Sequence, residues 1–239
     1  MKKIKICGVD ITTENEREIL EYITKRLEHD NEKVFIITPN PEILTYASRY
    51  PEFKRILNTA QVAIPDGIGV VLASKIVARG VEKRITGVDL MEKLCFEFSK
   101  RGLTTGFFGG FDCVAERTAE CLREKHPKLV VKFAGNEEDL PKLIHCDIDF
   151  LFVALGFPKQ EEWIYKNLPK LKIKGAMGVG GAFDYLGGKV TRAPKMVRNL
   201  GFEWLFRLAV QPWRVKRQLA LLEFMWFVIK EKLQGSKIN

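Results

Sequence analysis

A short apolar run breaks at a proline and opens into a glycine-flanked turn at Val62-Ala63-Ile64-Pro65-Asp66-Gly67-Ile68-Gly69. Such a run is typical of a buried strand, and the helix-period stretch at 70–77 predicts a crossover helix after it. In an open α/β sheet, ligands bind just beyond the carboxyl ends of the strands. Asp66 therefore lies where a carboxylate can act as a base, hold a ligand or cap the following helix.

Apolar strands alternate with helix-period segments along most of the chain. Strands are predicted at 3–7, 34–38, 61–64, 104–108, 129–134, 149–155 and 175–179, with helices between them. A capping box is predicted at Thr13-Glu14-Asn15-Glu16, where it would open the first helix. This alternation predicts an α/β fold, with a Rossmann-like, mostly parallel sheet flanked by helices.

The last fifth of the chain differs from the body in charge and aromatic content. The 239 residues carry a net charge of +9, of which +8 falls from Lys189 onward, and three of the four tryptophans lie there. The pattern predicts an α/β core at 1–192 and a helical C-terminal appendage at 193–239. The appendage should be interrupted at Gln211-Pro212, because proline cannot continue a helix interior.

Cysteine usage and metal-ligand spacing point away from disulfides and metals. The five cysteines are odd in number and form no CxxC pair, and the chain does not open with a secretory signal. A reduced, cytoplasmic compartment is expected, with no cofactor or metal. Asp147-Ile148-Asp149 superficially matches a metal–nucleotide DxD element, but it starts a buried strand at the wrong edge of the sheet.

Polar residues and glycines collect at five predicted strand ends, which should meet at one edge of the sheet and form a cleft. They are Thr38 and Asn40, Asp66, Gly109 and Gly110, Gln160 and Glu161, and Gly180 and Gly181. The glycine pairs could admit a diphosphate, although neither forms the GxGxxG dinucleotide fingerprint. Without a metal, Arg84 is the best candidate to offset leaving-group charge; its alternative is an ordinary surface arginine.

The appendage admits three interpretations. Aromatic and aliphatic residues interleaved with Arg and Lys are typical of a helix lying in a membrane interface. The same segment could dock on the body or on a second copy, or grip nucleic acid. The apolar load favours the membrane interface. Its most apolar stretch, at 219–229, is too short to cross a bilayer, which needs about 20 residues.

Six motifs in order along the chain resemble the TagA/WecG/CpsF family of bacterial glycosyltransferases. They are Thr38-Pro39-Asn40-Pro41-Glu42, Pro65-Asp66-Gly67-Ile68-Gly69, Arg84-Ile85-Thr86-Gly87-Val88-Asp89-Leu90, Gly156-Phe157-Pro158-Lys159-Gln160-Glu161, Arg192-Ala193-Pro194 and Gly201-Phe202-Glu203-Trp204-Leu205-Phe206-Arg207-Leu208. The resemblance implies inverting, metal-independent transfer from a UDP-sugar to undecaprenyl-diphosphate-linked GlcNAc. In the teichoic-acid branch the donor is UDP-N-acetylmannosamine and the acceptor is the GlcNAc 4-hydroxyl. Other branches use a uronic-acid or glucose donor.

The resemblance also implies roles for individual residues. Asp66 matches the family's base, while Thr38, Asn40 and Gln160 would line the substrate cleft and Arg84 would offset the diphosphate charge. Gly109, Gly110, Gly180 and Gly181 would admit the nucleotide. The tail would close over the site and face the lipid diphosphate through Arg207, Arg214 and Arg217. One departure is Gln211-Pro212-Trp213-Arg214, where family members often carry Glu-Pro-Arg-Arg.

The partners expected on this basis are a UDP-sugar, a polyprenyl-diphosphate-GlcNAc acceptor and the cytoplasmic membrane surface, with a possible homo-oligomer and no nucleic acid. The protein would be peripheral on the inner face of the cell membrane. The competing hypothesis is a nucleotide- or nucleic-acid-binding module without enzymatic activity, whose tail grips phosphates.

Overall fold

A computed structural model describes residues 1–29, 32–77, 80–81, 84–212 and 215–235; the side chains at 199, 216–219 and 234–235 are outside the description. Its centre is a six-stranded sheet in the order β4-β3-β8-β7-β5-β6, and every recorded strand pair in it is parallel. The strands are β3 (Val34–Ile37), β4 (Val62–Ala63), β5 (Thr104–Gly109), β6 (Val130–Gly135), β7 (Ile148–Ala154) and β8 (Ile173–Gly178). The predicted α/β class is confirmed.

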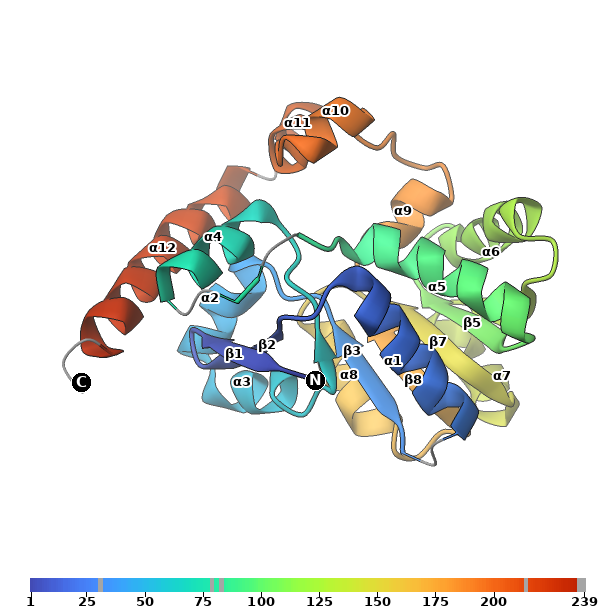
Figure 1. Cartoon of the computed structure of the whole chain (residues 1–239). Helices are drawn as coiled ribbons and strands as arrows, with labels where there is room; N and C mark the ends of the chain where they lie inside the picture. Colours follow the sequence, from blue (N-terminus) through green and yellow to red (C-terminus); the bar gives the residue numbers. More distant parts are fainter. Residues whose placement is uncertain (30–31, 78–79, 82–83, 213–214, 236–239) are drawn as a thin grey trace.

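Helices cover both faces of this sheet, as the near-continuous apolar strands require. Phe35 and Ile37 of β3 belong to one core cluster and Val34 and Ile36 to the other, because successive side chains point to opposite faces. One face packs against α1 (Glu16–His29), α5 (Gly87–Arg101), α6 (Val114–Lys125) and α9 (Ala182–Leu186). The other packs against α2 (Pro41–Arg49), α3 (Pro51–Leu57), α7 (Leu140–His145) and α8 (Lys159–Asn167) (Figure 1).

The predicted first strand does not belong to the main sheet. β1 (Lys3–Ile6) pairs antiparallel with β2 (Val9–Thr12) in a separate hairpin, and β2 was not predicted. Cys7 and Gly8 form the connection with φ of 53° and 74°, the positive values that a tight two-residue hairpin turn needs. The chain therefore reverses here instead of crossing over to a parallel neighbour.

The predicted capping box is displaced by two residues. Asn15 Oδ1 accepts from the Glu18 N–H, and Glu18 Oε2 accepts from the Asn15 N–H, each at 3.0 Å. Thr13 cannot serve as the cap because its backbone N–H and hydroxyl both donate to the Lys2 carbonyl beside the hairpin. The first helix consequently begins at Glu16.

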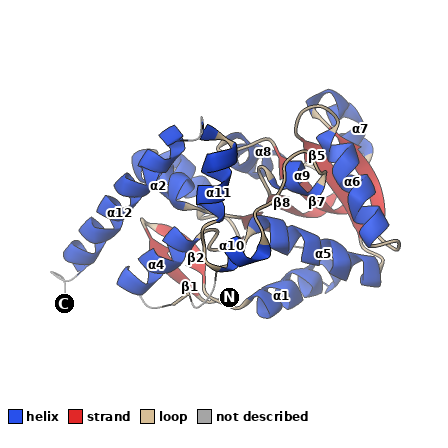
Figure 2. Cartoon of the chain, turned by 90° about the horizontal axis from the view of Figure 1, so that it is seen from above, coloured by secondary structure: helices blue, strands red, loops and turns tan. Residues whose placement is uncertain are grey.

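The C-terminal segment forms α10 (Lys195–Asn199), α11 (Glu203–Val210) and α12 (Val215–Gly235), with the expected interruption after Val210. Seen from above, α10 and α11 cross the top of the molecule between α12 and α9 (Figure 2). In the described part of the chain, no helix is both long and apolar enough to span a bilayer.

The last helix shares the core of the body. α12 packs on α2 and on α4 (Ile68–Val77), and Phe224 and Val228 are fully buried among body residues. The Thr45 hydroxyl donates to the Ala220 carbonyl at 3.1 Å, and the Cys7 N–H donates to Glu231 Oε2 at 2.7 Å. α12 is thus anchored to the body by packing and by hydrogen bonds.

Candidate active site

A cavity of about 720 Å³ opens at the carboxyl edge of the sheet, roofed by the C-terminal helices. Nine of the predicted site residues line it together, from five strand ends, the loop before α5 and α11. They are Thr38, Asn40, Asp66, Arg84, Gly110, Gln160, Gly180, Gly181 and Arg207. Parallel strands end at the same edge, which is why positions so far apart in sequence converge here.

Of the three other predicted site residues, the structure describes the surroundings of Gly109 alone. Gly109 lies just behind the cavity: with φ of 104°, it lets β5 approach β7 so closely that a Cβ would fall 2.9 Å from the Ala154 backbone. Arg214 lies outside the described residues, and so does the side chain of Arg217.

Asp149, of the DxD-like element, does not line the cavity. Its carboxylate accepts from the Thr104 N–H at 2.7 Å and pairs with Lys174, as expected of a residue at the start of a strand.

Asp66 follows β4, and its backbone N–H donates to the Pro39 carbonyl at 3.1 Å, which fixes the turn between two strand ends. The next residue, Gly67, has a φ of 96°, a conformation that other residues rarely adopt. The Asp66 carboxylate accepts a hydrogen bond from the backbone N–H of Gly87. Asp66 therefore contacts the start of α5, whose N-cap is Thr86.

The environment of Asp66 perturbs its protonation. Burial raises the pKa of Asp66 to about 6, against the lowering effect of Arg84 and the Gly87 N–H, while Glu203 and Asp89 add to the rise. Although the residue keeps a partly exposed surface in the cavity, protein atoms surround the carboxylate densely. A carboxyl group with this pKa is ionised at neutral pH and is basic enough to take a proton.

Neighbouring polar groups are held by the strand ends themselves. The Thr38 hydroxyl donates to the Gly178 carbonyl at 3.3 Å, joining the ends of β3 and β8. Asn40 caps α2, with its Oδ1 accepting from the Ile43 N–H at 3.0 Å. Each side chain therefore has a structural role as well as a position in the cavity.

Gln160 is fixed by both ends of its amide. Its Oε1 accepts from the Gly180 N–H at 2.9 Å, and its Nε2 donates to Glu161 Oε1 at 2.7 Å. Glu161 is fully buried, and burial raises its pKa to about 7. Its second oxygen has no hydrogen-bond partner among the described residues. The Gln160-Glu161 dipeptide thus holds the glycine turn after β8 against the start of α8.

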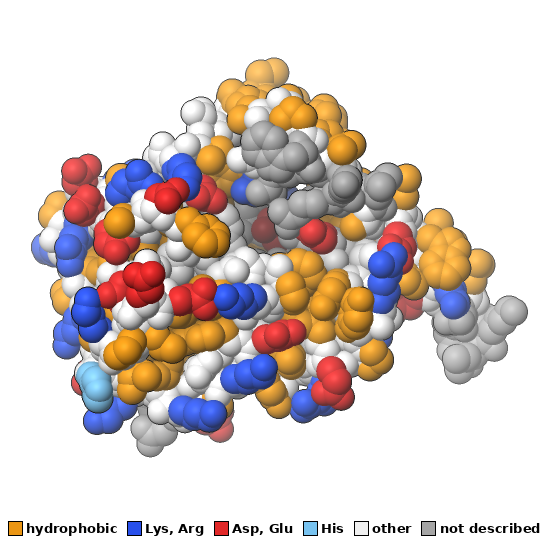
Figure 3. Space-filling view, turned by 180° about the vertical axis from the view of Figure 1, so that it is seen from behind, with side chains coloured by type: hydrophobic (Ala, Val, Ile, Leu, Met, Phe, Trp, Pro, Cys, Tyr) orange, Lys and Arg blue, Asp and Glu red, His pale blue; other side chains and the backbone are white. Residues whose placement is uncertain are grey.

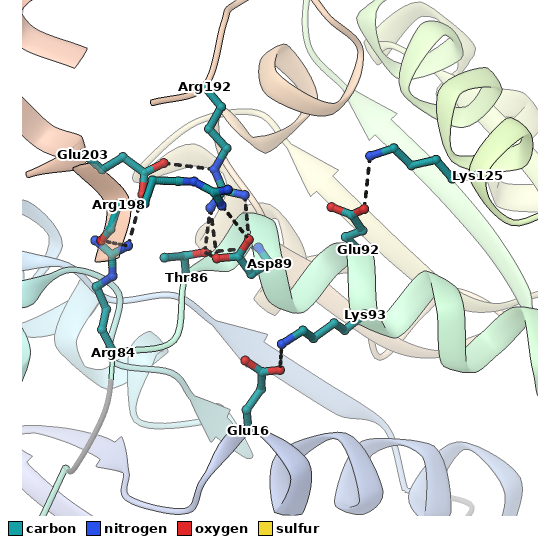
Figure 4. Close-up of polar contacts among 10 residues, drawn as sticks. All are labelled: Glu16, Arg84, Thr86, Asp89, Glu92, Lys93, Lys125, Arg192, Arg198 and Glu203. Carbon is teal, nitrogen blue, oxygen red and sulfur yellow. Dashed lines mark hydrogen bonds and ion pairs between the residues drawn. The ribbon is translucent and has the colours of Figure 1, made fainter. Parts of the chain in front are cut away.

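The C-terminal helices bring further side chains to the cavity. From α11, Arg207 stacks on the Tyr185 ring with its guanidinium carbon 4.8 Å from the ring centroid, and it lies against Gly181. Glu203, also on α11, lies 3.3 Å from Arg84 (Figure 4). The sequence had indicated no role for Glu203; its signal was a single carboxylate in an otherwise apolar and basic block.

The cavity lining combines polar and apolar groups. Asp66, Arg84 and the glycine turns are among the polar groups, whereas Ile68, Leu72, Leu221 and Met225 of α4 and α12 are among the apolar ones. Among the described residues, no three His, Cys, Asp or Glu side chains gather closely enough to hold a metal ion. The arrangement suits a ligand with both a charged part and an apolar part.

Known proteins are similar to this chain over nearly its whole length. Residues 4–238 match the model of the glycosyl transferase WecG/TagA/CpsF family. This chain belongs to that family. The resemblance stated from the motifs is confirmed.

Two relatives illustrate the similarity, both named N-acetylglucosaminyldiphosphoundecaprenol N-acetyl-beta-D-mannosaminyltransferase. The protein from Bacillus spizizenii is 33% identical over 215 residues, which cover 87% of this chain and 83% of the relative. The protein from Staphylococcus aureus strain MRSA252 is 32% identical over 245 aligned positions, which cover 98% of this chain and 95% of the relative. Family membership makes the chain a glycosyltransferase and identifies the cavity as its candidate active site.

Proposed function

We propose that this glycosyltransferase moves N-acetylmannosamine from UDP-N-acetylmannosamine to the 4-hydroxyl of undecaprenyl-diphosphate-linked GlcNAc, a step in making the linkage unit of wall teichoic acid. The observation that carries the proposal is that Asp66 and Arg84 line one cavity, a carboxylate with a pKa of about 6 and a cation close enough to lower that pKa. The names of the relatives support the choice of sugar and acceptor.

The reaction needs one base and one group that accommodates leaving-group charge. Asp66 takes the proton of the acceptor hydroxyl as its oxygen attacks the anomeric carbon of the donor. The bond from that carbon to the diphosphate breaks, and UDP leaves with the electron pair. Attack from the face opposite the diphosphate inverts the anomeric centre. Arg84 offsets the charge that develops on the leaving diphosphate, so the step requires no metal.

The remaining cavity groups have corresponding roles in this proposal. The Gly110, Gly180 and Gly181 turns admit the nucleotide because they lack side chains that would fill the space. Gln160, held rigid by Gly180 and Glu161, contributes its amide to the sugar. Arg207 of α11 faces the lipid diphosphate together with Arg214 and Arg217. Ile68, Leu72, Leu221 and Met225 give the start of the polyprenyl chain an apolar exit.

A panel of donors tests this function. UDP-N-acetylmannosamine, UDP-GlcNAc, UDP-glucose and UDP-N-acetylmannosamine uronate are each offered with a lipid-diphosphate-GlcNAc acceptor, with and without EDTA. We expect turnover with UDP-N-acetylmannosamine, unaffected by the chelator, and a β-linked product by NMR. Preference for the uronate or glucose donor would place the enzyme in another branch of the family, and turnover with none would contradict the proposal.

The Asp66→Asn variant tests the base. We expect transfer to fall by about a hundredfold to ten-thousandfold, because general-base catalysis contributes roughly 10²–10⁴-fold and the amide cannot take the proton. UDP binding, measured by calorimetry, should survive. Normal turnover by this variant would show that another group is the base.

The proposal also places the protein on the cytoplasmic membrane surface, where a polyprenyl diphosphate is anchored. Eleven of the nineteen exposed large apolar side chains among the described residues lie in the C-terminal segment from Met196 onward, including Phe202, Trp204, Leu222 and Trp226. The rear view shows orange side chains gathered at the top of the molecule, over α10 and α11, and on α12 (Figure 3). Such an apolar surface on amphipathic helices suits an interfacial location.

A further inference from the structure

Glu203 joins two arginines that belong to different parts of the molecule. Its Oε2 lies 3.3 Å from Arg84, and its Oε1 accepts from Arg192 Nε at 3.1 Å (Figure 4). Arg84 precedes α5 in the body, Arg192 lies in the segment before α10, and Glu203 is the first residue of α11. The side chains of Glu203 and Arg192 are each only 16% exposed, so solvent screens this pair weakly.

The ion pairs and hydrogen bonds around these two arginines differ in geometry. Arg192 binds Asp89 through two nitrogens at 2.6 and 3.0 Å, the bidentate arrangement that is strong in proteins. The Thr86 hydroxyl donates to Asp89 at 2.6 Å, and Arg198 lies 3.5 Å from the same carboxylate. The contact between Arg84 and Glu203 uses one nitrogen at 3.3 Å and is the loosest of the carboxylate contacts to Arg84 or Arg192.

Both partners in this loose contact line the cavity. A diphosphate that approaches Arg84 therefore meets Glu203 on the same guanidinium. Two anions at one guanidinium repel each other, whereas Glu203 keeps its contact with Arg192 if it releases Arg84. An arginine fork presents donors to a phosphate in the same plane in which it presents them to a carboxylate.

We propose that Glu203 is a positioning residue that holds Arg84 in place before the donor arrives and is replaced on Arg84 by the diphosphate. The inference rests on the proposed function in one respect only, that the incoming anion is the diphosphate of a UDP-sugar. Glu203 competes with the donor diphosphate for the Arg84 guanidinium, and its charge acts on the base, Asp66.

The action on the base follows from the charges around Asp66. Arg84 lowers the pKa of Asp66, whereas Glu203 and Asp89 raise it. Glu42, Asp184, Lys189 and Arg207 are the other charged residues lining the cavity. Removing the charge of Glu203 takes away one of the two carboxylates that favour the protonated form, so the pKa of Asp66 should fall.

The Glu203→Gln variant tests the competition. Calorimetry with UDP as the probe should show binding about three- to tenfold tighter than in the wild type at low salt, since every factor of ten in affinity corresponds to about 1.4 kcal/mol. The gain should shrink as salt screens the charges. Glu223→Gln is the matched control, because it removes a carboxylate that pairs with Arg49 and does not line the cavity. It should leave UDP binding unchanged.

A second variant tests whether the effect of Glu203 on UDP binding depends on Arg84. In an Arg84→Ala background, Glu203→Gln should no longer tighten UDP binding, because the guanidinium contested by the two anions is gone. A gain that persists without Arg84, or UDP binding by Glu203→Gln that equals or falls below the wild type, would overturn the competition.

Titration of the Asp66 carboxyl, followed by carbon NMR without any ligand, tests whether Glu203 raises the pKa of Asp66. Asp66→Asn assigns the resonance. Glu203→Gln should lower the midpoint, and Glu223→Gln should not move it. An unmoved midpoint in Glu203→Gln would overturn the electrostatic action of Glu203 on Asp66. If the wild type bound no UDP, the proposed function would fail, while this titration would still decide whether Glu203 acts on Asp66.

Discussion

At the scale of the residue, the ionised carboxyl of Asp66 lowers the stability of the folded chain. Its pKa of about 6 lies above the ordinary value of 3.8, so the folded chain binds this proton more tightly than the unfolded chain. The unfavourable contribution of the ionised carboxyl is therefore absent below about pH 4, grows between pH 4 and 6 and is fully present above pH 6. A polar but uncharged residue at this position would remove it.

We accordingly expect Asp66→Asn to be more stable than the wild type at pH 7.5, by up to about 3 kcal/mol, since one pKa unit corresponds to 1.36 kcal/mol. The difference should vanish near pH 3.5. Urea denaturation at the two pH values measures it, and the wild-type activity should show an acidic limb near pH 6. Equal stabilities at pH 7.5 would mean that the carboxylate is well solvated in the cavity.

At the scale of elements, α12 has a buried inner face and an exposed outer face. Phe224 and Val228 are fully buried against the body, whereas Leu222 is 72% exposed and Trp226 is 56% exposed. The hydrophobic period of a helix produces both faces from one short stretch of sequence. The inner face anchors the helix that carries Leu221 and Met225 into the cavity.

Phe224→Ala should lower the free energy of unfolding by about 3–5 kcal/mol, the usual effect of removing a buried aromatic side chain. Leu222→Ala, on the same helix, should change it by less than about 0.5 kcal/mol because its side chain is exposed. Chemical denaturation of both variants checks the pair. A small effect of Phe224→Ala would indicate that α12 is not docked on the body as the structure has it.

At the scale of the whole molecule, much of the positive charge between Lys189 and Arg207 is paired with carboxylates or directed into the cavity. Arg192 and Arg198 contact Asp89, Lys189 pairs with Asp112, and Arg207 points into the cavity. The sequence had counted these residues toward a basic surface. The proposed membrane contact therefore depends more on exposed apolar side chains than the charge alone suggested.

Replacing Leu222 and Trp226 together by Ser should weaken binding to phosphatidylglycerol vesicles at least about tenfold, with little change in stability, because buried apolar area drives interfacial binding. Ile144→Ser is the matched control: Ile144 is 49% exposed on α7, at the end of the molecule away from α12 (Figure 1). Co-sedimentation with vesicles measures the binding. If the double variant bound like the wild type, the outer face of α12 would not be the membrane contact.

Local pattern predicted the elements well because apolar period and turn chemistry act over a few residues. The strand before Asp66, the helices around it and the interruption at Gln211-Pro212 all followed from such signals. The hairpin at the start was missed because β1 has the composition of a sheet strand, and only the turn at Cys7 and Gly8 diverts it. The strand-end rule likewise predicted most of the polar residues and glycines that line the cavity.

The sequence by itself determined the α/β class, the convergence of Thr38, Asp66, Gln160 and the glycine turns, and the family. Each of these depends on residues close together in the chain or on the common direction of parallel strands. The tertiary structure alone revealed that Asp66 contacts the start of α5, that Glu203 contacts Arg84, and that α12 completes the body's core. These depend on contacts between segments more than a hundred residues apart, or on which of two helix starts a carboxylate reaches, and no local pattern encodes either.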